Sequence, residues 1–171
     1  IAKATSKPIK EYLIYHITNQ YENPTTVGTD AMFIHMAEKY YLTGVMPISE
    51  DGKKRIKDRV NVLKPLLVSK AFPTLTVSDV KKQQIRINQI PAEYLVVTFY
   101  SPTCGHCKEA APLLKEAYDK YKSKGVKIVA IAIDQDKDWE KFIKDYKLEE
   151  LINGYDFAHQ IDYRNKFDVM S

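Results

Sequence analysis

The feature that most constrains this chain is a pair of cysteines set between an apolar run and an amphipathic segment. Cys104 and Cys107 are the two cysteines of the chain, and two residues separate them. The run before them, 94–100, is rich in β-branched and aromatic residues and predicts a buried strand. The segment after them, 109–121, has apolar residues at helical spacing and predicts a helix. The cysteines are therefore expected where a strand passes into a helix.

This junction predicts different roles for the two thiols. Cys104 falls at the N-terminus of the predicted helix, where free N–H groups and the helix dipole stabilise an anion. For a cysteine that anion is the thiolate, the form that attacks disulfides. Cys107 lies one turn further on and can resolve the mixed disulfide by bonding to Cys104. Gly105 leaves room for another backbone, and a positive charge on His106 would favour the Cys104 thiolate.

Three other interpretations of the cysteine pair are weaker. A structural disulfide is one of them, but a disulfide across a two-residue gap at a helix start would be a poor cross-link. A structural metal site needs four ligands, and Cys104, Cys107 and His106 supply three at most, with no second cysteine pair. Inert core thiols would not need glycine and histidine between them. The pair is therefore predicted to be the redox centre itself, with no metal or organic cofactor.

The same segment resembles the active site of the thioredoxin superfamily. Cys-Gly-His-Cys is the pair found in protein disulfide isomerases and many bacterial envelope thioredoxins, and Pro112 matches a helix-kinking proline of that family. The sequence from Gly125 to Asp134 looks most like that of the TlpA/ResA-like thiol–disulfide oxidoreductases. The resemblance covers roughly residues 69–171. It implies an α/β thioredoxin-like fold, protein dithiol or disulfide substrates, a thiol–disulfide electron donor or acceptor, and a bacterial cell envelope or periplasmic location.

The sequence departs from the pattern of this family at its acids. The buried acid of thioredoxin, six residues before the first cysteine, corresponds to Thr98 here. The glutamate that TlpA/ResA-like proteins often carry three residues after the second cysteine corresponds to Ala110, and Glu109 stands one position early. Either acid would have served as proton acceptor for the buried cysteine. In this chain, Glu109 and water are the two candidates for the role of proton acceptor.

Residues 1–68 are predicted to form a small helical N-terminal domain. Apolar residues at helical spacing indicate one helix over 9–20 and a second that Thr29 or Asp30 caps. Gly44 ends the second helix, and Ser49 caps a third. His35 and Glu38 are one turn apart on the second helix, but without a further ligand they are expected to be a surface or packed pair.

Residues 69–171 are predicted to form the thioredoxin-like domain. Two short strands, 72–77 and 84–87, are expected to make a hairpin before the strand 94–100. A second buried strand, 126–133, has apolar residues on both faces, as parallel strands do. The remaining predictions are a helix over 139–146 capped by Asp138 and a turn at Asn153-Gly154. The resemblance further implies a short helix and exit at 164–169.

The resemblance also implies that the fold is C-terminally incomplete. Thioredoxin-like domains continue past this point with a cis-proline, two antiparallel strands and a helix, and the sequence stops at Ser171 before them. The chain is therefore expected to be a fragment of a longer protein. The strand 95–100 would then be an apolar edge, through which the chain can associate with another chain.

Composition excludes two classes of partner. Lys and Arg number 26 against 22 Asp and Glu, and the net charge of +4 is spread among interspersed signs, so no nucleic-acid stripe is expected. No apolar run reaches the ~18 residues that a membrane span needs. The chain opens at Ile1 rather than Met, and no leader is visible in it.

Two functions follow from these patterns. The leading hypothesis is a thiol–disulfide oxidoreductase that exchanges disulfides with protein substrates. His106 favours an oxidase or isomerase direction, and the TlpA/ResA resemblance favours a reductase. The alternative is a binding or scaffolding module with a low-activity thioredoxin-like docking domain. The 12 tyrosines and the absence of both family acids favour this alternative.

Overall fold

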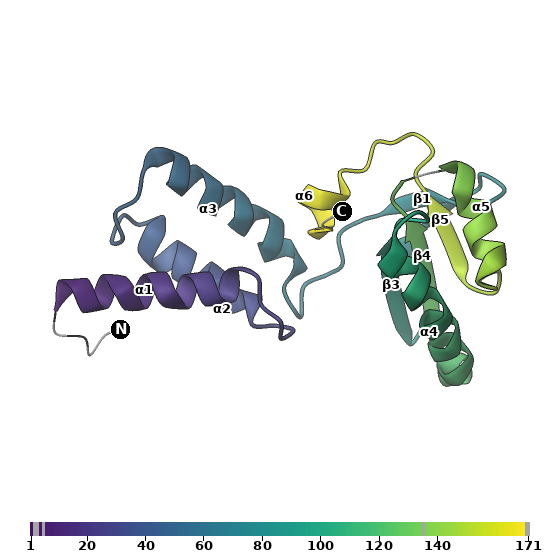
Figure 1. Cartoon of the computed structure of the whole chain (residues 1–171), viewed down its shortest axis with the longest axis horizontal. Helices are drawn as coiled ribbons and strands as arrows, with labels where there is room; N and C mark the ends of the chain where they lie inside the picture. The colour runs from purple at the N-terminus through teal and green to yellow at the C-terminus, as the bar shows by residue number, and fades with distance from the viewer. Residues whose placement is uncertain (2–3, 5, 135, 170–171) are drawn as a thin grey trace. The chain divides into compact units, whose positions relative to one another are not determined.

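The computed structural model describes residues 1, 4, 6–134 and 136–169. The chain divides into two compact units, Ile1–Pro73 and Thr74–Ser171, which Figure 1 shows in purple to teal and in teal to yellow. Met170 and Ser171, which the predicted thioredoxin-like domain includes, lie outside the described residues.

The first unit is helical, as predicted. Its helices are α1 (Lys7–Glu22), α2 (Asp30–Met36) and α3 (Glu50–Leu63). A turn of π-helix (Ala37–Tyr41) extends α2, and a 3₁₀ turn (Lys64–Leu66) follows α3.

Local signals in the sequence set the ends of these helices. The Ser49 hydroxyl accepts a hydrogen bond from the Gly52 N–H at 3.1 Å, which confirms the predicted cap of α3. Gly44 follows the second helical segment with a φ of 80°, a left-handed conformation that glycine adopts without strain. The buried side chains between the helices include Ile14, Phe33, Ile34, Met36, Ala37, Tyr41, Val60 and Leu63.

The second unit is a mixed sheet with helices on its faces. The strands are β1 (Thr76–Ser78), β2 (Gln84–Arg86), β3 (Tyr94–Tyr100), β4 (Val126–Ala132) and β5 (Ile152–Tyr155). Their order in the sheet is β2-β1-β5-β4-β3. The predicted hairpin is β1–β2, and β3, β4 and β5 are parallel to one another.

Three helices belong to this sheet: α4 (Gly105–Tyr121), α5 (Asp136–Asp145) and α6 (Tyr163–Phe167). Alternate residues of β4 and the inner sides of α4 and α5 share one core, so both helices cover the same face. Phe99 of β3 meets α6 on the opposite face, with ring centroids 5.2 Å from Phe167. The order of these helices and strands is the α/β arrangement that the sequence predicted.

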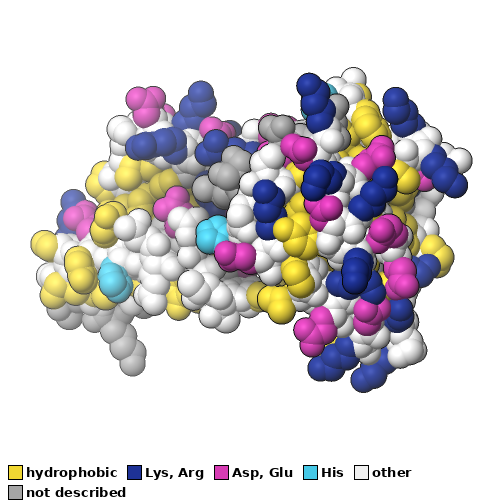
Figure 2. Space-filling view, turned by 45° about the vertical axis from the view of Figure 1, so that its right-hand side comes forward, with side chains coloured by type: hydrophobic (Ala, Val, Ile, Leu, Met, Phe, Trp, Pro, Cys, Tyr) yellow, Lys and Arg dark blue, Asp and Glu magenta, His cyan; other side chains and the backbone are white. Residues whose placement is uncertain are grey.

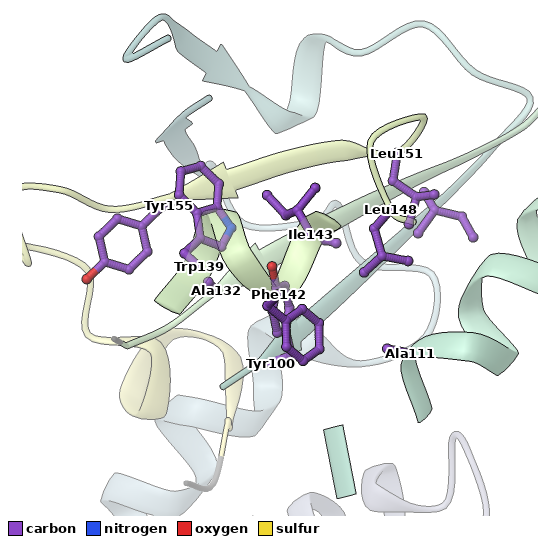
Figure 3. Close-up of a cluster of buried hydrophobic side chains, with 11 residues drawn as sticks. Tyr100, Ala111, Ala132, Trp139, Phe142, Ile143, Leu148, Leu151 and Tyr155 are labelled. Atoms are coloured by element: carbon purple, nitrogen blue, oxygen red, sulfur yellow. The ribbon is translucent and has the colours of Figure 1, made fainter. Parts of the chain in front are cut away.

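Aromatic side chains fill the core beneath α4 and α5 (Figure 3). Tyr100 stacks on Phe142 with ring centroids 4.7 Å apart, and Trp139 lies 5.6 Å from Tyr155. Such pairs add about 0.5–1.5 kcal/mol each beyond the area they bury. The first pair attaches α5 to the end of β3, the strand that leads into the cysteines, and the second attaches α5 to β5.

Two local predictions in this unit are wrong. Asn153-Gly154 is not a turn but the middle of β5. Asn153 is buried there, and its side-chain amide donates to the Leu148 and Leu151 carbonyls at 2.8 and 3.0 Å. Asp138 does not cap its helix, because α5 already begins at Asp136 and Asp138 lies within the first turn.

The strand β3 is less buried than its apolar sequence predicts. Tyr94 and Val96 are 60% and 43% exposed, and β3 is the outer strand of the sheet formed by the described residues. The expected edge over 95–100 is therefore present in that part of the chain.

Gly154 gives a test of the β5 register. A Cβ atom there would overlap Cγ2 of Val77 on β1. We expect Gly154→Ala to lower the free energy of unfolding by about 1–3 kcal/mol, the usual effect of overpacking. Urea unfolding followed by the fluorescence of Trp139, the one tryptophan of the chain, reports on this unit.

The double variant Gly154→Ala, Val77→Ala is the matched control. Because Val77→Ala removes the overlapping methyl groups, adding Gly154→Ala to that background should cost less than it does in the original chain. An equal cost in both backgrounds would contradict the close approach of β5 to β1.

Candidate active site

The cysteine pair lies at the carboxyl end of β3. The strand ends at Tyr100, and the loop that follows places Cys104 at the N-cap of α4, with φ −70° and ψ 127°. The Cys104 N–H donates to the Ser101 carbonyl at 3.2 Å, and the Lys108 N–H donates to the Cys104 carbonyl at 3.1 Å. These bonds hold the first cysteine at the start of the helix, where the sequence predicted it.

The two thiols are free and chemically unlike. The pKa of Cys104 is lowered, first by the backbone N–H of Cys107, then by the Cys107 thiol, with a further contribution from the backbone N–H of His106. The pKa of Cys107 is raised, and the largest cause is burial. Cys107 also packs against the aromatic core of Figure 3. The helix start thus favours a thiolate at position 104 and a thiol at position 107.

The side chains between and after the cysteines face solvent. His106 Nδ1 lies 3.7 Å from Glu109 Oε2, and the two side chains are 97% and 82% exposed. The group of His106 that lowers the pKa of Cys104 is its backbone N–H. A Cβ at Gly105 would meet no heavy atom within 4 Å, so the space over that residue is open to an approaching chain.

Pro112 lies inside α4, as predicted. Proline has no N–H, so the Lys108 carbonyl lacks its helical donor one turn earlier. Pro112 itself is exposed, and the neighbouring Ala111 is buried against the core.

An apolar groove of about 520 Å³ opens beside Cys107. Its walls come from β3, α4, β4, α5 and Leu148, and none of its lining residues is an aspartate or glutamate. Thr98 and Ala110, which stand at the positions of the family's acids, both line it. The lining residues are Thr98, Phe99, Tyr100, His106, Cys107, Ala110, Ala111, Leu113, Leu114, Ala117, Ala130, Phe142 and Leu148.

The sequence did not single out Asp134 as a site residue, yet its charge raises the pKa of both cysteines. Asp134 follows β4, and one of its carboxylate oxygens, Oδ1, is buried without a hydrogen-bond partner among the described residues. Its position directly after an apolar parallel strand was the available signal, because the carboxyl ends of such strands share one edge of a sheet.

A sequence profile of the AhpC/TSA family matches residues 68–167, more than half of the 171-residue chain. The chain belongs to the AhpC/TSA family. The matched residues include all five strands and both cysteines of this AhpC/TSA domain.

Relatives and solved structures agree with this assignment. The thiol-disulfide oxidoreductase ResA of Bacillus cereus is 30% identical over 83 residues, which are 48% of this chain and 48% of ResA. The chain therefore spans about half the length of the curated relatives it matches. This match confirms the resemblance to TlpA/ResA-like proteins.

The crystal structure of a domain of a possible thiol-disulfide isomerase from Cytophaga hutchinsonii is 29% identical, with a TM-score of 0.59 over 63% of this chain and 74% of that one. A thioredoxin-like protein from Bacteroides caccae is 22% identical, with a TM-score of 0.74 over 96% of this chain and 60% of that one. The second likeness shows the fold alone, and together they confirm that the AhpC/TSA domain is thioredoxin-like.

Two further classes of site find no support in the part of the chain that the structure describes. No group of three or more His, Cys, Asp or Glu side chains there is arranged to hold a metal ion. His35 is exposed, and Glu38 instead accepts a hydrogen bond from Lys64 at 2.6 Å. Within those same residues no helix has the length and hydropathy to cross a bilayer.

The unequal pKa values of the AhpC/TSA domain's cysteines predict the order of their alkylation. At mildly acidic pH, iodoacetamide should label Cys104 of the reduced chain faster than Cys107, because a lowered pKa keeps the thiolate populated at lower pH. The difference should narrow as the pH rises toward the raised pKa of Cys107. Peptide mapping by mass spectrometry after timed quenching measures both rates.

The control for this experiment is the chain unfolded in urea, in which the two thiols should react at similar rates. Faster labelling of Cys107 in the folded chain would contradict the assignment.

Proposed function

We propose that this chain is a thiol–disulfide oxidoreductase that exchanges disulfides with protein substrates through Cys104 and Cys107. The observation that carries the proposal is the contrast between the two thiols. Backbone N–H groups of α4 lower the pKa of Cys104, and burial raises the pKa of Cys107 one turn later. The family membership and the likeness to ResA support the same class of reaction.

The geometry suits a two-step exchange. The Cys104 thiolate attacks one sulfur of a substrate disulfide, and the other substrate sulfur leaves as a thiolate. The Cys107 sulfur then attacks Cys104 and displaces the remaining substrate sulfur. The substrate gains two electrons, and the chain ends with a Cys104–Cys107 disulfide. The reverse sequence oxidises a substrate dithiol, and the potential of the partner dithiol or disulfide sets the direction.

Four neighbouring residues support the pair in this proposal. Gly105 leaves space for a substrate backbone over the thiols. His106 contributes its backbone N–H to the Cys104 thiolate, and with Glu109 it presents an exposed polar pair to a docking protein. Pro112 interrupts the hydrogen bonds of α4 one turn beyond Cys107.

The cysteines themselves are the redox centre, so the proposal requires no metal or organic cofactor. The proposed partners are proteins with reactive dithiols or disulfides and a thiol–disulfide electron donor or acceptor. We also propose a bacterial cell envelope or periplasmic location, on the resemblance to envelope thioredoxins. The charge pattern does not suit nucleic acid, since acidic and basic side chains intermingle on the face of the sheet-containing unit that Figure 2 shows.

Trapping of mixed disulfides tests the two roles. We expect Cys107→Ser to accumulate a covalent complex with a substrate protein such as oxidised insulin, because the resolving thiol is missing. Cys104→Ser should accumulate none, because the attacking thiol is missing. Non-reducing electrophoresis and mass spectrometry of the complexes measure this. Complexes formed by Cys104→Ser and not by Cys107→Ser would reverse the roles.

We further propose that the exposed edge of β3 pairs with a second copy of this chain. Tyr94 and Val96 are exposed on this apolar, uncharged strand, a kind of edge that invites pairing. Val96→Lys should therefore shift the chain toward monomer in size-exclusion chromatography with light scattering. Val80→Lys, at the far end of the sheet, is the matched control and should leave the distribution unchanged. A chain that is already monomeric at high concentration would contradict the pairing.

A further inference from the structure

Resolution of a mixed disulfide requires Cys107 to lose a proton. Burial raises the pKa of this thiol, so at neutral pH it is mostly protonated and a poor nucleophile. A nearby base would remove this obstacle. The groove beside Cys107 has no carboxylate among its lining residues, and the carboxylate of Glu109 is at the surface beside His106.

The charge of one carboxylate, that of Asp134 just beyond the neighbouring strand β4, acts on both cysteines. β3 and β4 are parallel and in register up to Tyr100 and Ala132. The Ile133 N–H then donates to the Tyr100 carbonyl at 3.0 Å, which continues the pairing for one more residue. Asp134 therefore leaves the sheet at the same edge as the loop that carries Cys104.

Asp134 is partly buried. Its Oδ1 atom is buried and has no hydrogen-bond partner among the described residues. The Tyr100 hydroxyl and the Trp139 indole nitrogen are buried as well. The Asp134 oxygen therefore has its lone pairs available to accept a hydrogen from a donor.

The neighbouring titratable groups among the described residues differ from Asp134 in exposure or in charge. Asp134 raises the pKa of both cysteines, and each cysteine shifts the pKa of the other. Burial raises the pKa of Tyr100, so its hydroxyl stays protonated. Lys137 and Asp138, on the first turn of α5, are exposed, as are His106 and Glu109. Asp134 is thus the carboxylate whose charge acts on both cysteines.

We propose that Asp134 accepts the proton of Cys107 during resolution of the mixed disulfide. This inference rests on the proposed function and names a further residue for it. The Cys107 S–H bond breaks, and the proton passes to the Asp134 carboxylate. The Cys107 sulfur forms a bond with Cys104 while the bond between Cys104 and the substrate breaks. The substrate sulfur leaves with the electron pair, and Asp134 returns the proton to solvent or to that sulfur.

The aromatic disulfide dithiobis(nitrobenzoate) separates the two steps in one stopped-flow trace. Attack by Cys104 on the reagent releases one thionitrobenzoate, and resolution by Cys107 releases a second. We expect Asp134→Asn to slow the second release at neutral pH by about a hundredfold, the low end of the 10²–10⁴ typical of general bases. The first release should not slow. The deficit in the second should shrink as rising pH deprotonates Cys107 without help.

The sign of the effect separates a proton acceptor from a merely electrostatic neighbour. The charge of Asp134 raises the pKa of Cys107, so its removal alone would lower that pKa and speed the second release. A second release that is unchanged or faster in Asp134→Asn therefore overturns the proposal. Asp138→Asn, an exposed acid on the following turn, is the matched control and should leave both releases unchanged.

Two further measurements distinguish the loss of proton transfer from misfolding of the variant. Asp134→Glu restores a carboxylate and should recover part of the lost rate, and no recovery in a folded variant would count against proton transfer. Trp139 fluorescence checks folding, since this side chain packs in the adjoining core. A failure of the proposed function looks different, because the original chain would then release no thionitrobenzoate faster than an unfolded dithiol does.

Discussion

The parallel pairing of β3 with β4 is the constraint on which the site depends. Seven residue pairs, from Tyr94–Val126 to Tyr100–Ala132, hold the two strands in one register. Their carboxyl ends therefore lie together, with the cysteine loop on one and Asp134 on the other. A slip of one residue would turn every side chain to the opposite face and separate Tyr100 from Phe142.

The difference between the thiols follows from where α4 starts and what it covers. Its first turn has backbone N–H groups without helical partners, and these point toward Cys104. Its inner face packs on the sheet through Ala111, and this packing takes Cys107 partly out of water. The same turn of helix thus stabilises one anion and disfavours the other. The start of α4 alone therefore accounts for the attacking role of one cysteine and the resolving role of the other.

Much of this arrangement could be predicted from the sequence, because its signals are local. The apolar run 94–100, the helical spacing after Cys107 and the two-sided apolar run 126–133 each specify one element. The predicted turn at Asn153-Gly154 failed because its residue types favour turns, whereas close approach of Val77 requires a glycine inside the sheet.

The environment of the site could not be predicted in the same way. Whether His106 and Glu109 face solvent or the thiols depends on the direction of each side chain from the helix, which spacing alone does not give. Asp134 lies 30 residues after Cys104 in the sequence, and only the register of β3 with β4 brings the two together. Long-range placement of this kind is a property of the sheet and not of any one segment.

Reduction of insulin by dithiothreitol tests the central claim of catalysed disulfide exchange most directly. The rate of insulin precipitation should rise well above that with dithiothreitol alone when the chain is added, and Cys104→Ser should abolish the increase. A folded chain that gives no increase over dithiothreitol would contradict the account, and would favour a docking domain of little turnover.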